Sequence, residues 1–449
     1  MAKNPEIIEL ISDGVPTSKV AARISEGIDI HASGNMGLTA LHHAAHKNNL
    51  ECVKLLLSNG GDPNIPDNCG YTPVHIAAKY GHEESLKELC AHGADIHVKD
   101  EIGFTPLHLA LLDGKSQCAA FLLRKGANPN MYYKYMGYEI HTVNPESPEC
   151  LELLLQYGAD PNVRNARGLT ALHVSCQEGN DRFVQLLLLY SADLNAKSQN
   201  PAKGDVTPLR CAVMEDEKKI VGILLENGAD PNEPDSRLNT PLHHAATQGN
   251  VEMAQILLRH NANVTALNES LNQPLHKACR FSHEPDMIRI LLENGADPNA
   301  LTDSGETPMM CVIWKYGHIS KEHLLEIDAE MKWKIALLVN YGAKVNFVND
   351  RVDPYSVIYS DLHKVDILSG SMNLLVEAAE RIAIHDSLAN HQPNFPGSVR
   401  EQLDFLKSNP RPLKHFARSS IRKYLGERCP VILPKLPLPQ SIIKYLQFL

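Results

Sequence analysis

Residues 37–64 read GLTALHHAAHKNNLECVKLLLSNGGDPN, and a close copy of this stretch begins at Gly70. Two markers recur along the chain, Thr-Pro/Ala-Leu-His and, further on in each copy, Gly-Ala-Asp-Pro-Asn or a variant of it. The second marker begins at residues 60, 93, 126, 158, 191, 228, 261, 295 and 342. Its period is near 33 residues, with two longer intervals of 37 and 47 residues. Such a period predicts stacked structural repeats.

Each copy contains the signals for two short helices. Thr supplies an oxygen that caps the first free amides of a helix, and the Pro that follows suits the first helical position. A second helix carries apolar residues at helical spacing, such as Val53, Leu56 and Leu57, and ends at a Gly suited to the left-handed conformation. Because neither helix can bury its apolar side alone, neighbouring units must stack into a solenoid.

These features resemble the ankyrin repeat, whose T-P-L-H-x-A signature is matched at 72–77, 105–110 and 240–245. The resemblance implies an all-α fold, an ankyrin-repeat solenoid of helix-turn-helix units with hairpin loops. Terminal repeats are expected to diverge because they present one polar face to water. The expected domains are a degenerate unit at 5–36, repeats over 37–342 with a degenerate unit near 131–162 and an inserted helix near 317–332, a degenerate unit at 343–384, a linker at 385–409 and a distinct segment at 410–449.

The composition indicates an intracellular protein. The formal net charge of −10 argues against a general nucleic-acid binder. No stretch of about 18 apolar residues spans a membrane, and the N-terminus lacks the apolar core of a signal peptide. The ten cysteines are scattered singly, as expected for buried thiols in a reducing compartment. We expect a cytoplasmic location, with the nucleus as a second compartment.

Two stretches imitate catalytic or metal sites. The histidines of LHHAAH at 41–46 suggest a metal site, but His42 belongs to the repeat itself, and no Cys or carboxylate stands nearby at zinc-ligand spacing. The same histidine recurs as His75, His108, His173, His243 and His276, where the resemblance implies a hydrogen-bonding role in the hairpin. Gly114-Lys115-Ser116 resembles the end of a phosphate-binding loop, but Leu109 stands where that loop needs Gly. We therefore expect no enzyme, no metal and no cofactor.

The C-terminal segment at 410–449 differs from the repeats, with eight Lys or Arg residues and a single acid, Glu427. Apolar positions at helical spacing predict an amphipathic helix there. They are Leu413, Phe416, Ala417, Ser420, Ile421, Tyr424 and Leu425. Four prolines between 430 and 439 then force an extended segment before a last apolar helix. This segment is too short to form a generous core of its own, so it needs a partner surface.

The segment resembles a SOCS box (suppressor of cytokine signalling box), and the chain is similar to the ankyrin repeat and SOCS box family. The elongin-binding residues that the resemblance implies are Pro412, Leu413, Phe416, Ala417 and Ile421. The cullin-binding residues that it implies are Leu436, Pro437, Leu438, Pro439, Ile443, Tyr445 and Leu446. The family usually has Cys where this chain has Ala417, which is expected to cost about 1 kcal/mol of elongin binding.

The resemblance implies a non-catalytic substrate-recognition subunit of a cullin-RING ubiquitin ligase. The SOCS box would recruit elongin B, elongin C and cullin-5 with its RING subunit, while the repeats hold an unidentified target protein. The alternative function is an ankyrin scaffold whose C-terminal segment only caps the solenoid. A third interpretation, a basic segment that binds an acidic membrane, is disfavoured because the prolines interrupt an interfacial helix.

Two stretches suggest where the target binds. MYYKYMGY at 131–138 brings together Tyr132, Tyr133 and Tyr135, which either form a recognition surface or fill space left by a shortened helix. Arg164 and Arg167 place positive charge between acidic loop tips, which either orients a partner or is only the solvated charge of a loop. Both alternatives stay open at this point.

Overall fold

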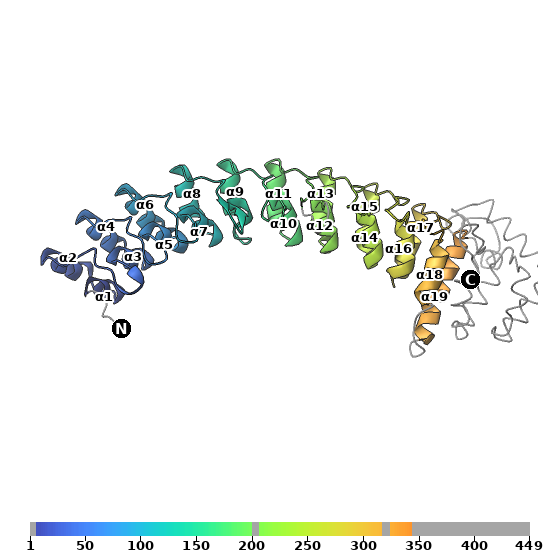
Figure 1. The fold of residues 1–449 in the computed structure, drawn as a ribbon, viewed down its shortest axis with the longest axis horizontal. Coiled ribbons are helices and arrows are strands. Elements are labelled where there is room, and N and C mark those ends of the chain that lie inside the picture. Colours follow the sequence, from blue (N-terminus) through green and yellow to red (C-terminus); the bar gives the residue numbers. More distant parts are fainter. Residues whose placement is uncertain (1–5, 200–205, 317–323, 344–449) are drawn as a thin grey trace, which may run out of the picture. The chain divides into compact units, whose positions relative to one another are not determined.

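The computed structural model describes residues 6–199, 206–316 and 324–343. These residues belong to two compact units, one ending at Cys211 and the other beginning at Ala212. Within each unit, short helices pair and the pairs follow one another (Figure 1). The expected unit at 343–384 (apart from Ala343), the linker and the SOCS box lie outside the described residues, so the fold defines the repeats alone.

The first unit is built of helix pairs interrupted by one small hairpin. Its elements are α1 (Glu6–Ser12), α2 (Thr17–Ser25), η1 (Asn35–Gly37), α3 (Ala40–His46), α4 (Leu50–Ser58), α5 (Pro73–Tyr80), α6 (Glu83–Ala91), α7 (Pro106–Leu112), α8 (Ser116–Arg124), β1 (Tyr132–Tyr133), β2 (Gly137–Tyr138), η2 (Glu139–His141), α9 (Pro148–Gln156), α10 (Ala171–Gln177) and α11 (Asp181–Leu189). First helices pack on first helices, as in α1, α3, α5 and α7. Second helices pack on second helices, as in α2, α4, α6 and α8.

The second unit repeats this plan. After α12 (Pro208–Met214), which begins in the first unit, come α13 (Lys218–Glu226), α14 (Pro241–Gln248), α15 (Val251–Arg259), α16 (Pro274–Phe281), α17 (Pro285–Glu293), α18 (Pro308–Tyr316) and α19 (Leu324–Asn340). The first helices α14, α16 and α18 pack in succession, and so do the second helices α13, α15, α17 and α19. Each unit is therefore two layers of helices, one of first helices and one of second helices.

The insertion expected near 317–332 is helical in its described part, but it does not form a separate helix. Residues 324–332 begin α19, which runs for 17 residues and is longer than the nine-residue second helices before it. The extra length supplies Glu330, the partner of a buried amine further along α19: Lys334 is buried and its Nζ donates to Ser282 O at 2.6 Å, at the C-terminal end of α16. Glu330 neutralises this amine at 2.8 Å.

The helix layers are closed by the apolar residues that the sequence places at helical spacing. Helix α4 buries Cys52, Val53, Leu56 and Leu57. Each apolar side chain of this size contributes about 1.5–3 kcal/mol when it is fully buried. The nine described cysteines form no disulfide bonds, and most of them are buried. None of the described helices has the length and hydropathy that a membrane span requires.

In five repeats, the signature histidine bonds the start of its own helix with one ring nitrogen and the loop of the following repeat with the other. In the repeat that starts with Thr72, the amide of Thr72 donates to His75 Nδ1 at 3.1 Å. Nε2 must then carry the proton, and it donates to Phe104 O, in the following loop, at 3.1 Å. The same pair of bonds occurs at His42, His173, His243 and His276. The hydrogen-bonding role expected of these histidines is confirmed.

Burial makes these histidines sensitive to pH. It lowers the pKa of His42, His75, His173 and His276, and lowers that of His243 to about 4. A pKa that is lower in the folded state means that the unfolded chain binds more protons between the two values. Stability from the neutral ring is therefore complete above about pH 6.5 and is lost as the pH falls toward the folded value.

We predict that wild type loses stability more steeply in acid than a His243→Gln variant. For a pKa that drops from 6.5 to about 4, the difference between about pH 7 and about pH 5 amounts to about 2 kcal/mol. Urea unfolding of the full chain at the two pH values measures it. Parallel losses in the two proteins would contradict the assignment, whatever the stability of the variant at neutral pH.

Candidate functional site

In the degenerate unit at 131–162, a two-stranded hairpin forms the loop that precedes the first helix, and a single 3-10 turn replaces the helix itself. Strands β1 and β2 are antiparallel, with Tyr132 opposite Tyr138 and Tyr133 opposite Gly137. The hairpin leads directly into the single 3-10 turn η2, which packs on α10 as a first helix would. The tyrosine-rich stretch singled out by the sequence is therefore a projecting hairpin on a minimal helix.

The base of the hairpin is held by a buried polar cluster. The Tyr133 hydroxyl donates to Glu139 Oε1 at 2.6 Å, and His108 Nδ1 donates to Glu139 Oε2 at 3.0 Å. The His108 and Glu139 side chains are fully buried, and Tyr133 is only 6% exposed. Burial first, and then the nearby Glu139, raise the pKa of the Tyr133 hydroxyl, which favours its role as a donor. Tyr133 thus fills space and is not available to a docked partner.

His108 uses the opposite ring nitrogen as a donor from the other repeat histidines. Its Nε2 has no hydrogen-bond partner within the described part of the chain. Glu139 binds Nδ1, so the ring proton lies on Nδ1 and Nε2 is left as an acceptor. A buried acceptor without a donor costs free energy, so Glu139 and Tyr133 must compensate for it. The cluster is a local repair of a repeat that has lost its normal start.

His141 takes over the link to the following unit, and sequence analysis missed it. The amide of Tyr138 donates to His141 Nδ1 at 3.3 Å, and Nε2 donates to Leu169 O at 3.2 Å. Burial lowers the pKa of His141 to about 4, as in the regular repeats. The sequence YEIH at 138–141 thus replaces Thr-Pro-Leu-His. Its histidine stands one repeat period, 33 residues, after His108, and this spacing could have revealed it.

The tip of the hairpin continues a row of exposed apolar loop tips. Met36, Cys69, Ile102 and Tyr135 each stand three residues before the first residue of a repeat signature. Met36 is 63% exposed, Ile102 is 72% exposed and Tyr135 is 83% exposed. Backbone bonds connect neighbouring tips, from the amide of Asn68 to Met36 O at 2.9 Å and from that of Glu101 to Cys69 O at 3.0 Å. We call these four residues the apolar tip row.

Tyr132 lies beside this row and is also exposed. Its ring packs edge-on against Tyr138 with 5.1 Å between centroids. About half of its surface remains open, and so does much of Met136 at the turn. The structure therefore separates the three predicted tyrosines. Tyr132 and Tyr135 lie on the surface, while Tyr133 belongs to the buried cluster.

The hairpin packs against the next loop tip, which carries the two predicted arginines. A Cβ on Gly137 would lie 2.8 Å from Asn165 Cα, and its φ of +93° also favours glycine. Arg164 is half-buried and its Nη1 donates to Lys197 O at 2.5 Å, so this guanidinium joins two loops. Arg167 is exposed. Of the two arginines, Arg167 is the one whose side chain is open to a partner beside the tyrosine hairpin.

Among the residues that the structure describes, no group of three or more His, Cys, Asp or Glu side chains could hold a metal ion. The predicted elongin-binding and cullin-binding residues, from Pro412 to Leu446, lie outside the described residues. The exposed side chains that lie around the hairpin in the described part are the apolar tip row, Tyr132 and Arg167.

Helix pairs that are linked through buried histidines define an ankyrin repeat protein. A family model of ankyrin repeats (3 copies) matches residues 16–100, 41–133, 140–235 and 232–302, more than half of the chain. A second model, of the SOCS box, matches residues 409–447. The chain belongs to the ankyrin repeat and SOCS box family, and the fold class predicted from the sequence is confirmed. This architecture is that of a SOCS-box substrate receptor in general.

The relatives that this chain resembles include two ankyrin repeat and SOCS box proteins. The chain is 26% identical over 350 residues to ankyrin repeat and SOCS box protein 16 of Mus musculus, covering 74% of this chain and 71% of the relative. It is 27% identical over 355 residues to ankyrin repeat and SOCS box protein 6 of Homo sapiens, covering 66% and 77%. The crystal structure of the human ASB11 ankyrin repeat domain is 27% identical with a TM-score of 0.43, and the match covers 51% of this chain and all of that one.

The two tyrosines Tyr133 and Tyr135 allow a matched test of the buried cluster. We predict that Tyr133→Phe lowers the free energy of unfolding by about 1.5–3 kcal/mol, because Glu139 loses a buried donor. Tyr135→Phe removes a hydroxyl from an exposed ring and should change it by less than about 0.5 kcal/mol. Urea denaturation of both full-length variants measures the difference. Equal effects would show that the hydroxyl of Tyr133 has no structural role.

Proposed function

We propose that this chain is the substrate-recognition subunit of a ubiquitin ligase formed with elongin B, elongin C, cullin-5 and its RING subunit. The observation that carries the proposal is the SOCS-box match at 409–447 behind an ankyrin repeat region. That range includes every residue from Pro412 to Leu446 for which the SOCS-box resemblance implies an elongin or cullin contact. The proposal includes a cytoplasmic or nuclear location, because ligases of this kind work inside the cell.

The expected elongin contact centres on Leu413. A leucine that enters a pocket on elongin C contributes about 1.5–3 kcal/mol through burial alone. The Pro-rich stretch that begins at Leu436 would select cullin-5 as a separate contact. The protein performs no covalent step. Its contribution is proximity, since a bound target presents its lysines to the ubiquitin-loaded enzyme at high effective concentration.

We assign target binding to the apolar tip row with Tyr132 and Arg167. Aromatic and apolar side chains on a rigid support lose little conformational entropy on binding, and they are enriched at recognition surfaces. The backbone bonds between neighbouring tips and the buried cluster below the hairpin supply that support. A single arginine at the edge would add charge selectivity.

Leu413→Asp tests the adaptor contact. The variant should lose elongins B and C from a tagged pull-down, because an aspartate cannot enter an apolar pocket without a large desolvation cost. The matched control is Leu189→Asp, at an exposed leucine of α11, which should retain both elongins. A double variant of Leu436 and Leu438 to Ala should keep the elongins and lose cullin-5. Unchanged partners in Leu413→Asp would favour the scaffold function.

A double variant, Tyr132→Ala with Tyr135→Ala, tests the target-binding surface. Proteins that co-purify with wild type and with the double variant are quantified by mass spectrometry. The amount of some of these proteins should fall by about tenfold or more in the double variant, while the amount of elongins B and C stays the same. Tyr157→Ala, a half-exposed tyrosine after α9, is the control and should retain them. Thermal melting must show that both variants are folded. If the double variant loses stability but no captured protein is selectively lost, the assignment of target binding to this surface is contradicted.

A further inference from the structure

In the second unit, Lys277 on α16 is unusual for its position. It stands four residues after the first residue of the repeat signature. In other repeats the same position holds an apolar side chain or a thiol (Ile76, Leu109, Val174, Cys211 and Cys311), a histidine (His43 and His244) or Thr142. No other repeat has a lysine at this place, so a permanently charged side chain is not needed for packing. Lys277 is half-buried, although lysines are mostly exposed unless they are paired.

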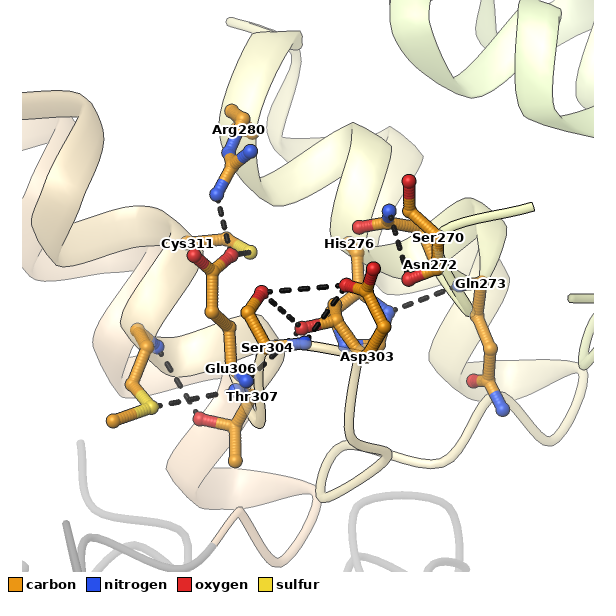
Figure 2. Close-up of polar contacts among 12 residues, drawn as sticks. Ser270, Asn272, Gln273, His276, Arg280, Asp303, Ser304, Glu306, Thr307 and Cys311 are labelled. Carbon is orange, nitrogen blue, oxygen red and sulfur yellow. Dashed lines mark hydrogen bonds and ion pairs between the residues drawn. The ribbon is translucent and has the colours of Figure 1, made fainter. Parts of the chain in front are cut away.

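The nearest cation to Lys277 on its own helix is held in a fixed position. Arg280 lies one helical turn further along α16, and its Nη2 binds Glu306 Oε2 at 2.5 Å (Figure 2). The same carboxylate oxygen accepts from the Cys311 thiol at 3.7 Å. Glu306 is buried and neutralises the charge of Arg280 from the interior side. The guanidinium remains partly exposed to solvent.

A third cation comes from the preceding loop tip. Arg237 is exposed, and its carbonyl accepts from the amide of Glu269 at 3.0 Å, which ties this tip to the tip that leads into α16. Both Arg280 and Arg237 lower the pKa of Lys277, after burial, which is the largest cause. The positive charges of both arginines therefore act on the Lys277 ammonium.

Nearby acids balance this charge only in part. Burial, Arg280 and Arg237 together lower the pKa of Lys277 more than Asp235 raises it, so the pKa falls overall. Asp235 also accepts from the backbone of its own loop and lies 3.2 Å from His244 Nε2, and Glu306 is bound to Arg280. Neither Lys277 nor Arg237 forms an ion pair within the part of the chain that the structure describes. A half-buried ammonium with no ion-pair partner is unfavourable, and a carboxylate supplied by another molecule would correct this.

Apolar surface adjoins the cations. The Lys277 ammonium lies 5.8 Å from the centroid of the Phe281 ring, which is 47% exposed. The loop tips contribute two exposed leucines, Leu238 and Leu271. A ligand that fits must therefore combine negative charge with apolar side chains. A peptide with acidic and apolar residues has this combination.

We propose that Arg237, Lys277 and Arg280, with Phe281, bind an acidic segment of the target protein, in which a Glu or Asp carboxylate pairs with Lys277 and an apolar neighbour contacts Phe281. This inference rests on the proposed function, since it describes the target that the repeats would hold. Its charge complementarity also predicts that binding weakens as salt is raised.

The test uses the full chain and a fluorescent peptide of alternating Glu-Glu and Leu, read by anisotropy. Wild type should bind this peptide and not its Gln-for-Glu analogue. Lys277→Glu should weaken binding by about tenfold or more, and Lys277→Arg should retain it. Arg259→Glu, the same charge change on the second helix α15, is the matched control and should bind as wild type does.

Equal binding of the Glu and Gln peptides, or unchanged binding by Lys277→Glu, would overturn the proposal. Preference for a phosphoserine version of the peptide, with no binding of the Glu version, would also overturn it. Thermal melting of each variant shows whether it is folded. Elongin co-purification, measured separately, reports on ligase recruitment, so a failure of the acidic-peptide site and a failure of the proposed function give different results.

Discussion

A neutral histidine that bonds the start of its own helix and the loop of the next unit is the contact on which the repeats depend. Both ring nitrogens are used, so one tautomer is fixed and the charged form is disfavoured. Because this bond crosses from one unit to the next, it sets the register of loop after loop. Equivalent residues therefore recur at equivalent places, and the apolar tip row is a direct consequence of that register.

The degenerate unit shows what happens when the pattern is broken. Glu139 stands where the signature has proline, binds His108 and Tyr133, and leaves only a 3-10 turn in place of a helix. Yet His141 restores the link to Leu169, so the stacking continues. The tip of the hairpin exposes aromatic side chains, while the buried cluster of Tyr133, Glu139 and His108 holds its base. Loss of the signature here and gain of an exposed aromatic surface are two results of one local change.

Local signals in the sequence were sufficient for the regular units. Thr-Pro starts, apolar spacing such as Val53 to Leu57, and glycine stops depend on neighbouring residues only, so the helices formed where they were expected. The burial of Tyr133 and the bridging role of Arg164 depend on residues that come from other loops, and composition alone could not separate Tyr133 from Tyr135. The buried Lys334 likewise requires the end of α16, 52 residues away in sequence.

The contacts between neighbouring repeats decide which residues hold the fold and which are free to bind a partner. Where a repeat position contacts the next unit, as His75 and His141 do, the side chain is fixed by two bonds and cannot serve a partner. Where a position accepts many kinds of side chain, as the place of Lys277 does, the fold leaves the residue free to be chosen for binding. Stacked repeats within a unit then lose little conformational entropy on binding, so a few such residues are enough to select a target.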